Sequence, residues 1–264
     1  VYLRPRDAVE AVRLYGEHPE AVPLAGGTDF MVGWNMGLLN GRTVLDLSAL
    51  KWGAVRPVAG GLKVGALATH AKLKRDPAIR RSFSLLAQAC ATVGGEQIQN
   101  RGTLGGNIAN ASPAGDSFPP LAVYEPMLHA VSPRGRRTIP FLEIFAGVKK
   151  TTLGPSELLE SIELKIPPRP ARQLYRKVGT RAAQAISKTV AAGLLWLDGK
   201  KRVSELRFAF GSVAPTVRRL KSVEAFIAGQ KLTRPVVAKA CALIEADISP
   251  IDDIRSTRDY RLEV

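Results

Sequence analysis

Apolar and polar positions follow two different periods along the chain, and these periods predict where helices and strands lie. Residues 7–18 carry apolar side chains at helical spacing, with Asp7 placed to cap the first turn. Short apolar runs at 21–25 and 43–47 predict buried strands, and a helix is expected to start between them at 29–36. The beginning of the chain therefore predicts a small β-α-β unit.

The middle of the chain has the pattern of a mixed α+β subdomain. Residues 84–93 are apolar at helical spacing and are followed by Gly94 and Gly95, a common helix stop. Runs at 55–58 and 62–65 flank a glycine-containing turn and predict a hairpin. Further strands are expected at 127–131, 137–139 and 158–166.

Pro167-Pro168-Arg169-Pro170 is typical of a linker and divides the chain. Beyond it the pattern predicts three strands followed by two helices, at 171–178, 189–197, 203–211, 219–228 and 234–246. The fold class expected is α+β, with a three-stranded antiparallel sheet in the second part. The predicted domains are 1–168, itself divided into 1–52 and 53–168, and 169–264.

Composition narrows the class of protein. The longest strongly apolar run among the 264 residues is 190–197, too short for a membrane span. Cys90 and Cys241 are far apart and form neither a disulfide framework nor a metal-binding pattern, so a reduced, cytoplasmic setting is expected. The chain begins at Val1 rather than Met, and we expect it to be trimmed.

Charge is the unusual quantity in this composition. The chain has 38 Lys and Arg against 23 Asp and Glu, a net charge of +15. Residues 1–164 carry 18 basic and 14 acidic side chains, whereas residues 165–264 carry 20 and 9. Most of the excess therefore lies beyond the linker, and it indicates an acidic or anionic partner of that region.

Two glycine-rich segments are the best candidates for a binding site. Residues 23–29 (PLAGGTD) run from a strand through a glycine pair to a helix start, where amides can bind a phosphate. An ordinary strand-to-helix turn has the same composition. Residues 101–116 (RGTLGGNIANASPAGD) are small and lack internal charge, which leaves room for a large ligand. An Ω-type surface loop is the alternative for this segment, and neither segment matches a Rossmann or P-loop motif.

At this spacing the two segments together resemble the FAD-binding (medium) subunit of the molybdenum hydroxylase family. That family includes xanthine dehydrogenase, aerobic carbon monoxide dehydrogenase and bacterial N-heterocycle dehydrogenases. Other stretches resemble the family in the same order, namely 148–153, 157–159, 175–178 and 252–256. The resemblance implies a PCMH-type FAD-binding fold of two subdomains, followed by a C-terminal α+β domain that closes over the flavin.

The resemblance also implies which residues hold FAD. Residues 23–30 would wrap the pyrophosphate, 103–107 would contact the phosphates and flavin edge, and Asp116 would bind the ribityl or ring region. Some relatives have an aromatic residue in place of Val93, and some have Lys in place of Arg176. The full set of expected cofactor contacts is Pro23, Leu24, Ala25, Gly26, Gly27, Thr28, Asp29, Phe30, Val93, Gly94, Thr103, Leu104, Gly105, Gly106, Asn107, Asn110, Ser112, Asp116, Leu153, Leu159 and Arg176.

No catalytic residue or metal ligand is expected in this chain, because a bound flavin carries out its own redox chemistry. His18, His70 and His129 are scattered along the sequence and are interpreted as surface or partly buried residues. The family implies noncovalent FAD here, and a molybdenum cofactor and iron–sulfur clusters on a large and a small partner subunit. Electrons would pass to NAD or another acceptor. A xanthine-like purine is the preferred substrate, with carbon monoxide or an N-heterocycle as the alternative.

Two functions of other classes compete with this hypothesis. A basic nucleic-acid-binding module would use a patch in the second part, formed by Arg172, Arg176, Lys177, Arg181 and Lys188. Only Tyr175 and Trp196 could stack on bases there, and no nucleic-acid-binding motif is present. A stand-alone flavin oxidase would need an acid–base pair that the sequence does not offer. We therefore prefer the hypothesis of an electron-transfer flavoprotein, which is expected to bind no nucleic acid and to have no membrane span.

Overall fold

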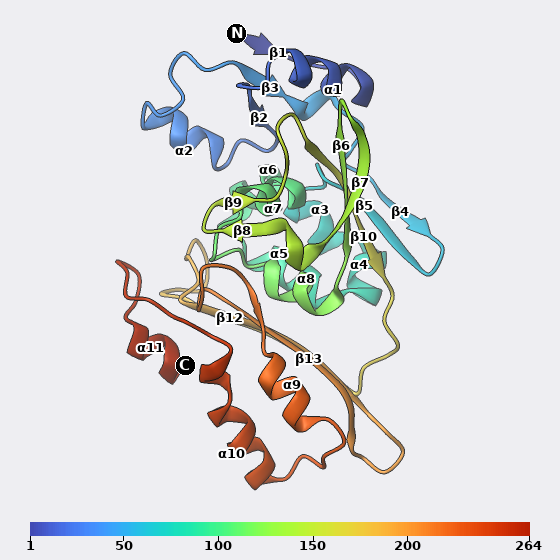
Figure 1. Ribbon diagram of the computed structural model, residues 1–264, viewed down its shortest axis with the longest axis vertical. Coiled ribbons are helices and arrows are strands. Elements are labelled where there is room, and N and C mark those ends of the chain that lie inside the picture. Colours follow the sequence, from blue (N-terminus) through green and yellow to red (C-terminus); the bar gives the residue numbers. More distant parts are fainter.

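The computed structural model describes residues 1–264, whose elements form three layers along the long axis (Figure 1). The N-terminal layer and the C-terminal layer lie at opposite ends, and a layer of helices on a sheet lies between them. None of the helices has the length and apolar character needed to cross a bilayer. The middle layer touches both of the other layers, so each of its two interfaces brings distant parts of the sequence together.

A three-stranded parallel sheet with strand order β1-β3-β2 forms the N-terminal layer. The helix and two strands expected here are present, and Asp7 accepts a hydrogen bond from the Glu10 amide at 2.9 Å. The first strand was not predicted, because it has only two residues. The elements of this layer are β1 (Tyr2–Leu3), α1 (Ala8–Glu17), β2 (Val22–Leu24), α2 (Phe30–Asn35), β3 (Val44–Asp46) and the 3₁₀ turn Leu47–Ala49.

The middle layer is an antiparallel five-stranded sheet covered by helices. Its strands in spatial order are β4 (Val55–Val58), β5 (Gly61–Gly65), β10 (Leu158–Lys165), β6 (Met127–Ser132) and β7 (Gly135–Pro140). Its helices are α3 (His70–Arg75), α4 (Pro77–Ser82), α5 (Ser84–Thr92), α6 (Glu96–Arg101), α7 (Leu104–Asn110) and α8 (Phe118–Tyr124). A separate ribbon pairs β8 (Phe145–Gly147) with β9 (Lys150–Thr151). The largest hydrophobic core lies in this layer and extends to the C-terminal sheet.

The second glycine-rich segment is partly a helix, so the Ω-loop alternative is wrong for residues 104–110. Thr103 caps α7 by accepting a hydrogen bond from the Gly106 amide at 3.0 Å. The helix packs so closely on β5 and its following turn that a Cβ at Gly105 would lie 2.5 Å from the Cβ of Ala66. Position 105 therefore requires glycine, because no side chain fits between α7 and Ala66. The low helix propensity of glycine is the reason that the sequence predicts a loop here.

The C-terminal sheet has four strands, where three were expected. Its order is β11 (Arg172–Val178), β12 (Thr189–Leu197), β13 (Val203–Gly211) and β14 (Arg218–Arg219). The additional strand consists of two arginines, which carry no apolar alternation, and it includes the first residue of the helix expected at 219–228. Helices α9 (Lys221–Ile227) and α10 (Arg234–Ala242) pack on one face, and α11 (Arg258–Glu263), which was not predicted, follows near the C-terminus.

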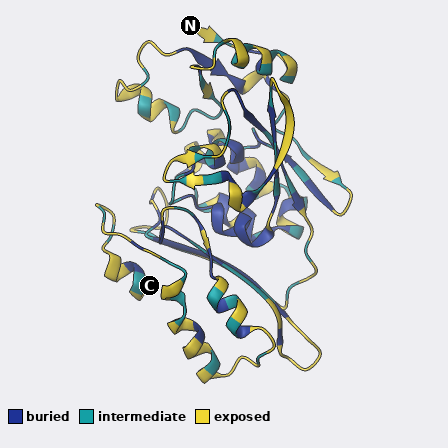
Figure 2. Ribbon diagram, in the orientation of Figure 1, coloured by how far each residue is buried: buried dark blue, intermediate teal, exposed yellow.

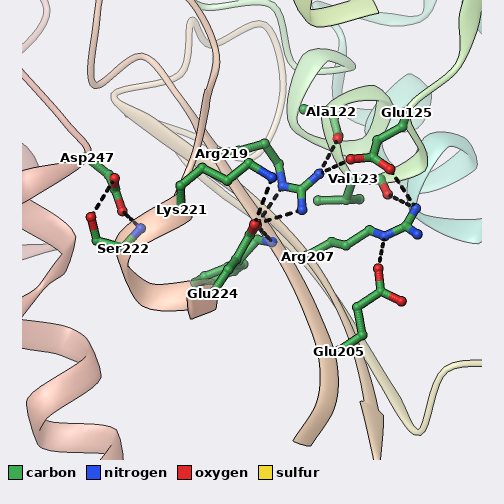
Figure 3. Close-up of polar contacts among 11 residues, drawn as sticks. Ala122, Val123, Glu125, Glu205, Arg207, Arg219, Lys221, Ser222, Glu224 and Asp247 are labelled. Atoms are coloured by element: carbon green, nitrogen blue, oxygen red, sulfur yellow. Dashed lines mark hydrogen bonds and ion pairs between the residues drawn. The ribbon is translucent and has the colours of Figure 1, made fainter. Parts of the chain in front are cut away.

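Two arginines of the C-terminal layer hold the end of α8 (Figure 3). Arg219 donates to the Ala122 carbonyl at 3.2 Å and forms ion pairs with Glu125 and Glu224, both at 2.6 Å. Arg207 pairs with the second carboxylate oxygen of Glu125 at 3.0 Å. Figure 2 shows that α8 and most of β12 are buried, while α10 and α11 are largely exposed. This interface fixes the C-terminal layer on the middle layer.

Candidate functional site

A cleft of about 730 Å³ opens between the N-terminal and middle layers. Its walls are the turn after β2 with α2, α7 with the residues just before it, and the β9–β10 connection with the start of β10. Most of the residues that the sequence singled out line it: Pro23, Ala25, Gly26, Gly27, Thr28, Asp29, Phe30, Val93, Thr103, Gly105, Gly106, Asn107, Asn110, Leu153 and Leu159. The fold therefore brings the two glycine-rich segments to one place.

Contact between the two glycine-rich segments requires glycine. A Cβ at Gly26 would lie 2.0 Å from the carbonyl oxygen of Arg101, which is a backbone atom that cannot rotate away. A Cβ at Gly102 would lie 3.4 Å from the Thr28 hydroxyl oxygen. The first segment thus packs backbone against backbone on the residues that precede α7, and this contact shapes the floor of the cleft.

Free backbone amides in the cleft lie in the first segment, at residues 25–30. None of their N–H groups donates to a protein atom, and the next amide along the chain, that of Met31, bonds the Gly27 carbonyl at 2.9 Å. Gly27 has a φ of +80°, the left-handed conformation found in anion-binding nests. A run of unused donors at a helix start favours a negatively charged acceptor such as a phosphate.

The amides at the start of α7 are used within the protein. Leu104 donates to the Ala68 carbonyl at 2.9 Å and Gly105 to the Ala66 carbonyl at 2.8 Å. The Gly106 amide is bound by Thr103, as described above. The free amides that line the cleft are therefore those of residues 25–30 and not those at the start of α7.

Three polar side chains link the walls at the mouth of the cleft. Lys149, in the turn between β8 and β9, donates to Asn110 at 2.7 Å and to Asp29 at 3.2 Å. Asn110 also donates to Asp29 at 3.2 Å. These side chains are exposed, so the cluster contributes little to stability. Its effect is to connect the start of α2, the end of α7 and the β8–β9 ribbon at the mouth of the cleft.

A buried ion pair lies where the C-terminal layer meets the middle layer. Lys177 of β11 donates to the Asp116 carboxylate and to the Thr92 carbonyl, at 2.7 and 2.8 Å. The Ser187 hydroxyl bonds the other carboxylate oxygen. Burial raises the pKa of Asp116, while Lys177 and then Ser187 oppose the rise. Asp116 is joined to the cleft through its neighbour Ser117, whose hydroxyl donates to Asn107 at 2.7 Å.

Comparison with known proteins identifies the family. Residues 1–168 match the FAD binding domain in molybdopterin dehydrogenase, and residues 174–264 match the CO dehydrogenase flavoprotein C-terminal domain. The chain belongs to this family of molybdopterin dehydrogenase flavoproteins. The resemblance, the α+β fold class and the oxidoreductase class expected from the sequence are thereby confirmed.

Individual relatives of this family cover almost the whole chain. The xanthine dehydrogenase FAD-binding subunit of Escherichia coli O157:H7 is 30% identical over 100% of this chain and 91% of its own length. The carbon monoxide dehydrogenase medium chain of Hydrogenophaga pseudoflava is 28% identical over 98% and 91%. A structure of carbon monoxide dehydrogenase from Hydrogenophaga pseudoflava superposes with a TM-score of 0.94 at 26% identity, covering 99% of this chain and 91% of its counterpart.

The cleft of this flavoprotein fits FAD. The free amides at 25–30 suit a diphosphate. Val93, Leu153 and Leu159 also line the cleft, and they are apolar like the dimethylbenzene side of a flavin. No charged side chain is needed at the diphosphate, because oriented amides supply the positive field. The residues present therefore match a long ligand with a charged centre and a flat apolar end.

Six of the expected contacts do not line the cleft. Leu104 is fully buried in the core, and Gly94 bonds the Gln184 amide through its carbonyl at 3.0 Å. Leu24 is half-buried on β2, and Ser112 accepts a weak hydrogen bond from the Ala114 amide at 3.4 Å. Arg176 is exposed and Asp116 is in the domain-interface ion pair, so both lie outside the cleft itself.

Sequence reasoning missed Lys177, Lys149 and His70 as site residues. Alternation in β11 could have found the first: Tyr175 and Lys177 are partly buried against the middle layer, while Arg176 between them is exposed. Lys149 lies in the stretch 148–153, which was considered only for its resemblance to the family. His70 was interpreted as a surface or partly buried residue, but it is 2% exposed and lines the cleft.

Substituting Lys177 with Met is expected to lower the free energy of unfolding by about 1–3 kcal/mol at pH 7, because Asp116 loses its buried cation. The loss is limited since Asp116 can take up a proton. Without Lys177 the pKa of Asp116 rises further above its unfolded value, so its stabilising contribution is present at low pH and is lost as pH rises through the folded pKa. Denaturant unfolding should therefore show a larger deficit at pH 8 than at pH 5.

The matched control is Arg176→Met, which removes a cation from the exposed face of the same strand. It is expected to change the unfolding free energy little at either pH. A deficit of equal size at both residues, or one that shrinks as the pH rises, would contradict the interpretation of the Asp116–Lys177 pair.

Proposed function

We propose that this chain is the FAD-binding electron-transfer subunit of a molybdenum-containing hydroxylase or dehydrogenase. The observation that carries the proposal is the run of free amides at 25–30 inside a cleft that the second glycine-rich segment completes. The cleft would hold FAD, which would supply the redox chemistry between the iron–sulfur clusters of a partner and NAD or another acceptor. The family membership of the whole chain supports this role.

The chain's own contribution is binding and orientation. The amides of 25–30 would hold the diphosphate, and the small residues of α7 would form the wall along which the cofactor extends. Leu153 and Leu159 would exclude water from the apolar end. We propose a division into an FAD-binding part at 1–168, with subdomains 1–52 and 53–168, and a C-terminal part at 169–264, in line with the separate sheets.

The partners proposed are a large subunit with the molybdenum cofactor and a small iron–sulfur subunit, in the cytoplasm. The name "medium chain" of the relatives from Hydrogenophaga pseudoflava and Afipia carboxidovorans supports a complex of this kind. A xanthine-like purine remains the preferred substrate because of the 30% identical xanthine dehydrogenase relative. Carbon monoxide and N-heterocycles are the alternatives, as the carbon monoxide dehydrogenase and nicotine 6-hydroxylase relatives suggest.

Nothing in the arrangement of charges favours the nucleic-acid-binding alternative. Lys177, which was part of the basic patch, is buried in an ion pair, and Lys188 lies 4.3 Å above the ring of Tyr260. The remaining cations of the patch are spread over a strand and a loop. Docking of an acidic partner, or attraction of an anionic electron acceptor, is a simpler explanation for the positive charge of residues 165–264 than nucleic-acid binding.

The proposed function is tested by co-expressing this chain with the large and small subunits of its complex. We expect the three to purify together, and both xanthine and NADH to bleach the flavin absorbance anaerobically. Reduction by NADH but not xanthine would retain the electron-transfer role and move the substrate to the alternatives. A complex that assembles with flavin but is reduced neither by any of these substrates nor by NADH would contradict the proposal.

A further inference from the structure

His70 is a buried side chain of the cleft to which neither the sequence nor the family match gives a role. It is the first residue of α3, it is 2% exposed, and its backbone amide donates to the Gly102 carbonyl at 3.0 Å. The residue also lines the cleft. Its imidazole is thus held between the protein core and the ligand space, next to the segment that leads into α7.

The protein leaves the ring of His70 without a hydrogen bond. Nδ1 is enclosed by protein atoms and has no partner. Burial lowers the pKa of His70 to about 4, so the ring is neutral at pH 7 and carries its proton on one nitrogen. An enclosed N–H without an acceptor is rarer and costlier than an enclosed lone pair. The proton is therefore favoured on Nε2.

The Nε2 edge of the ring lies beside Gly102, where the second glycine-rich segment touches the first. A Cβ placed on Gly102 would lie 3.3 Å from Cδ2 of His70, the ring carbon bonded to Nε2, and 3.4 Å from the hydroxyl oxygen of Thr28. His70 and Thr28 therefore flank the same glycine. Thr28 belongs to the segment with free amides, and its hydroxyl has no hydrogen-bond partner in the protein either.

We propose that the Nε2–H of His70 donates a hydrogen bond to the diphosphate of FAD, beside the Thr28 hydroxyl and the amides of residues 25–30. This inference rests on the proposed function, since it names a further binding residue of the same cleft. A neutral donor suits this place, because burying a cation next to the core would cost far more than burying an imidazole. The Nε2–H donor, which has no acceptor in the ligand-free chain, then gains one from the ligand.

The test compares three variants of the full chain freed of flavin, titrated with FAD, ADP and riboflavin. Gln places its amide nitrogen near the position of Nε2, Asn places its amide near Nδ1, and Leu has no donor. We expect His70→Leu and His70→Asn to weaken binding of FAD and ADP by about tenfold or more, the effect of losing a hydrogen bond to a charged group. His70→Gln should stay within about threefold of wild type for FAD, and riboflavin binding should be unchanged in all three.

Unfolding of the flavin-free chains separates binding from folding. Because Nδ1 is enclosed without a partner, His70→Leu is expected to unfold at the same temperature as wild type or higher. Wild-type FAD affinity in His70→Leu, an equal loss for riboflavin, or a lowered unfolding temperature that accounts for the weaker binding would each overturn the inference. If the wild-type chain binds neither FAD nor ADP, the proposed function itself fails, and the His70 inference with it.

Discussion

Replacing Gly26 with alanine is expected to abolish FAD retention and to destabilise the chain by about 3 kcal/mol. The added Cβ would lie 2.0 Å from the Arg101 carbonyl oxygen and 2.7 Å from its carbonyl carbon. Both are backbone atoms, so the two glycine-rich segments must move apart. Since the free amides of 25–30 are positioned by this contact, the diphosphate-binding geometry is lost together with the packing.

The measurement is flavin content after purification, followed by denaturant unfolding of the flavin-free chain. Gly199→Ala is the matched control: a Cβ there meets no atom within 4 Å, and the residue lies in a turn of the C-terminal layer. This control should bind FAD and unfold like wild type. A Gly26→Ala variant that retains a full complement of flavin would show that the contact between the segments does not shape the site.

Replacing Arg219 with Met is expected to cost about 3–5 kcal/mol, because the substitution removes the buried cation of Glu224 and leaves it only the exposed Lys221, at 3.2 Å. The side chain of Arg219 is 5% exposed and that of Glu224 is 10% exposed, so water cannot replace the lost partner. The end of α8 also loses the hydrogen bond to the Ala122 carbonyl and the ion pair with Glu125 (Figure 3). We therefore expect the C-terminal layer to loosen from the middle layer.

Thermal unfolding measures this effect, with an expected drop in midpoint of about 10 °C or more. Arg218→Met is the control, because Arg218 is the exposed neighbour on the same short strand and forms no ion pair. It should unfold within about 1–2 °C of wild type. Equal midpoints for the two variants would mean that the buried arginine does not hold the layers together.

Local patterns in the sequence predict most of the fold. The helix capped by Asp7, the hairpin at 55–65 and the long strands of both sheets follow from apolar periodicity and turn residues, which act over a few positions. Elements that depend on distant contacts were missed. β14 is two arginines defined by pairing with β13, and α7 is a glycine-rich helix stabilised by its close packing on Ala66.

The same distinction applies to the candidate site. Glycine pairs predict that the backbone approaches another group closely, but the sequence does not reveal that Gly26 approaches the carbonyl of Arg101. The free amides at 25–30 follow from the strand-to-helix turn. The amides at the start of α7 are used by the carbonyls of Ala66 and Ala68, which lie 39 and 36 residues earlier in the chain. For Lys177 the inward direction can be inferred from its alternation with Tyr175 along β11, whereas its partner Asp116, 61 residues away in the sequence, is brought to it only by the tertiary structure.

We propose that the cleft between the first two layers of this chain holds FAD noncovalently. The most direct test is to free the chain of flavin, titrate it with FAD, and then denature the complex and separate protein from supernatant. We expect saturation at one FAD per chain and release of all the flavin on denaturation. A chain that does not bind added FAD, or flavin that remains attached to the denatured protein, would contradict the account.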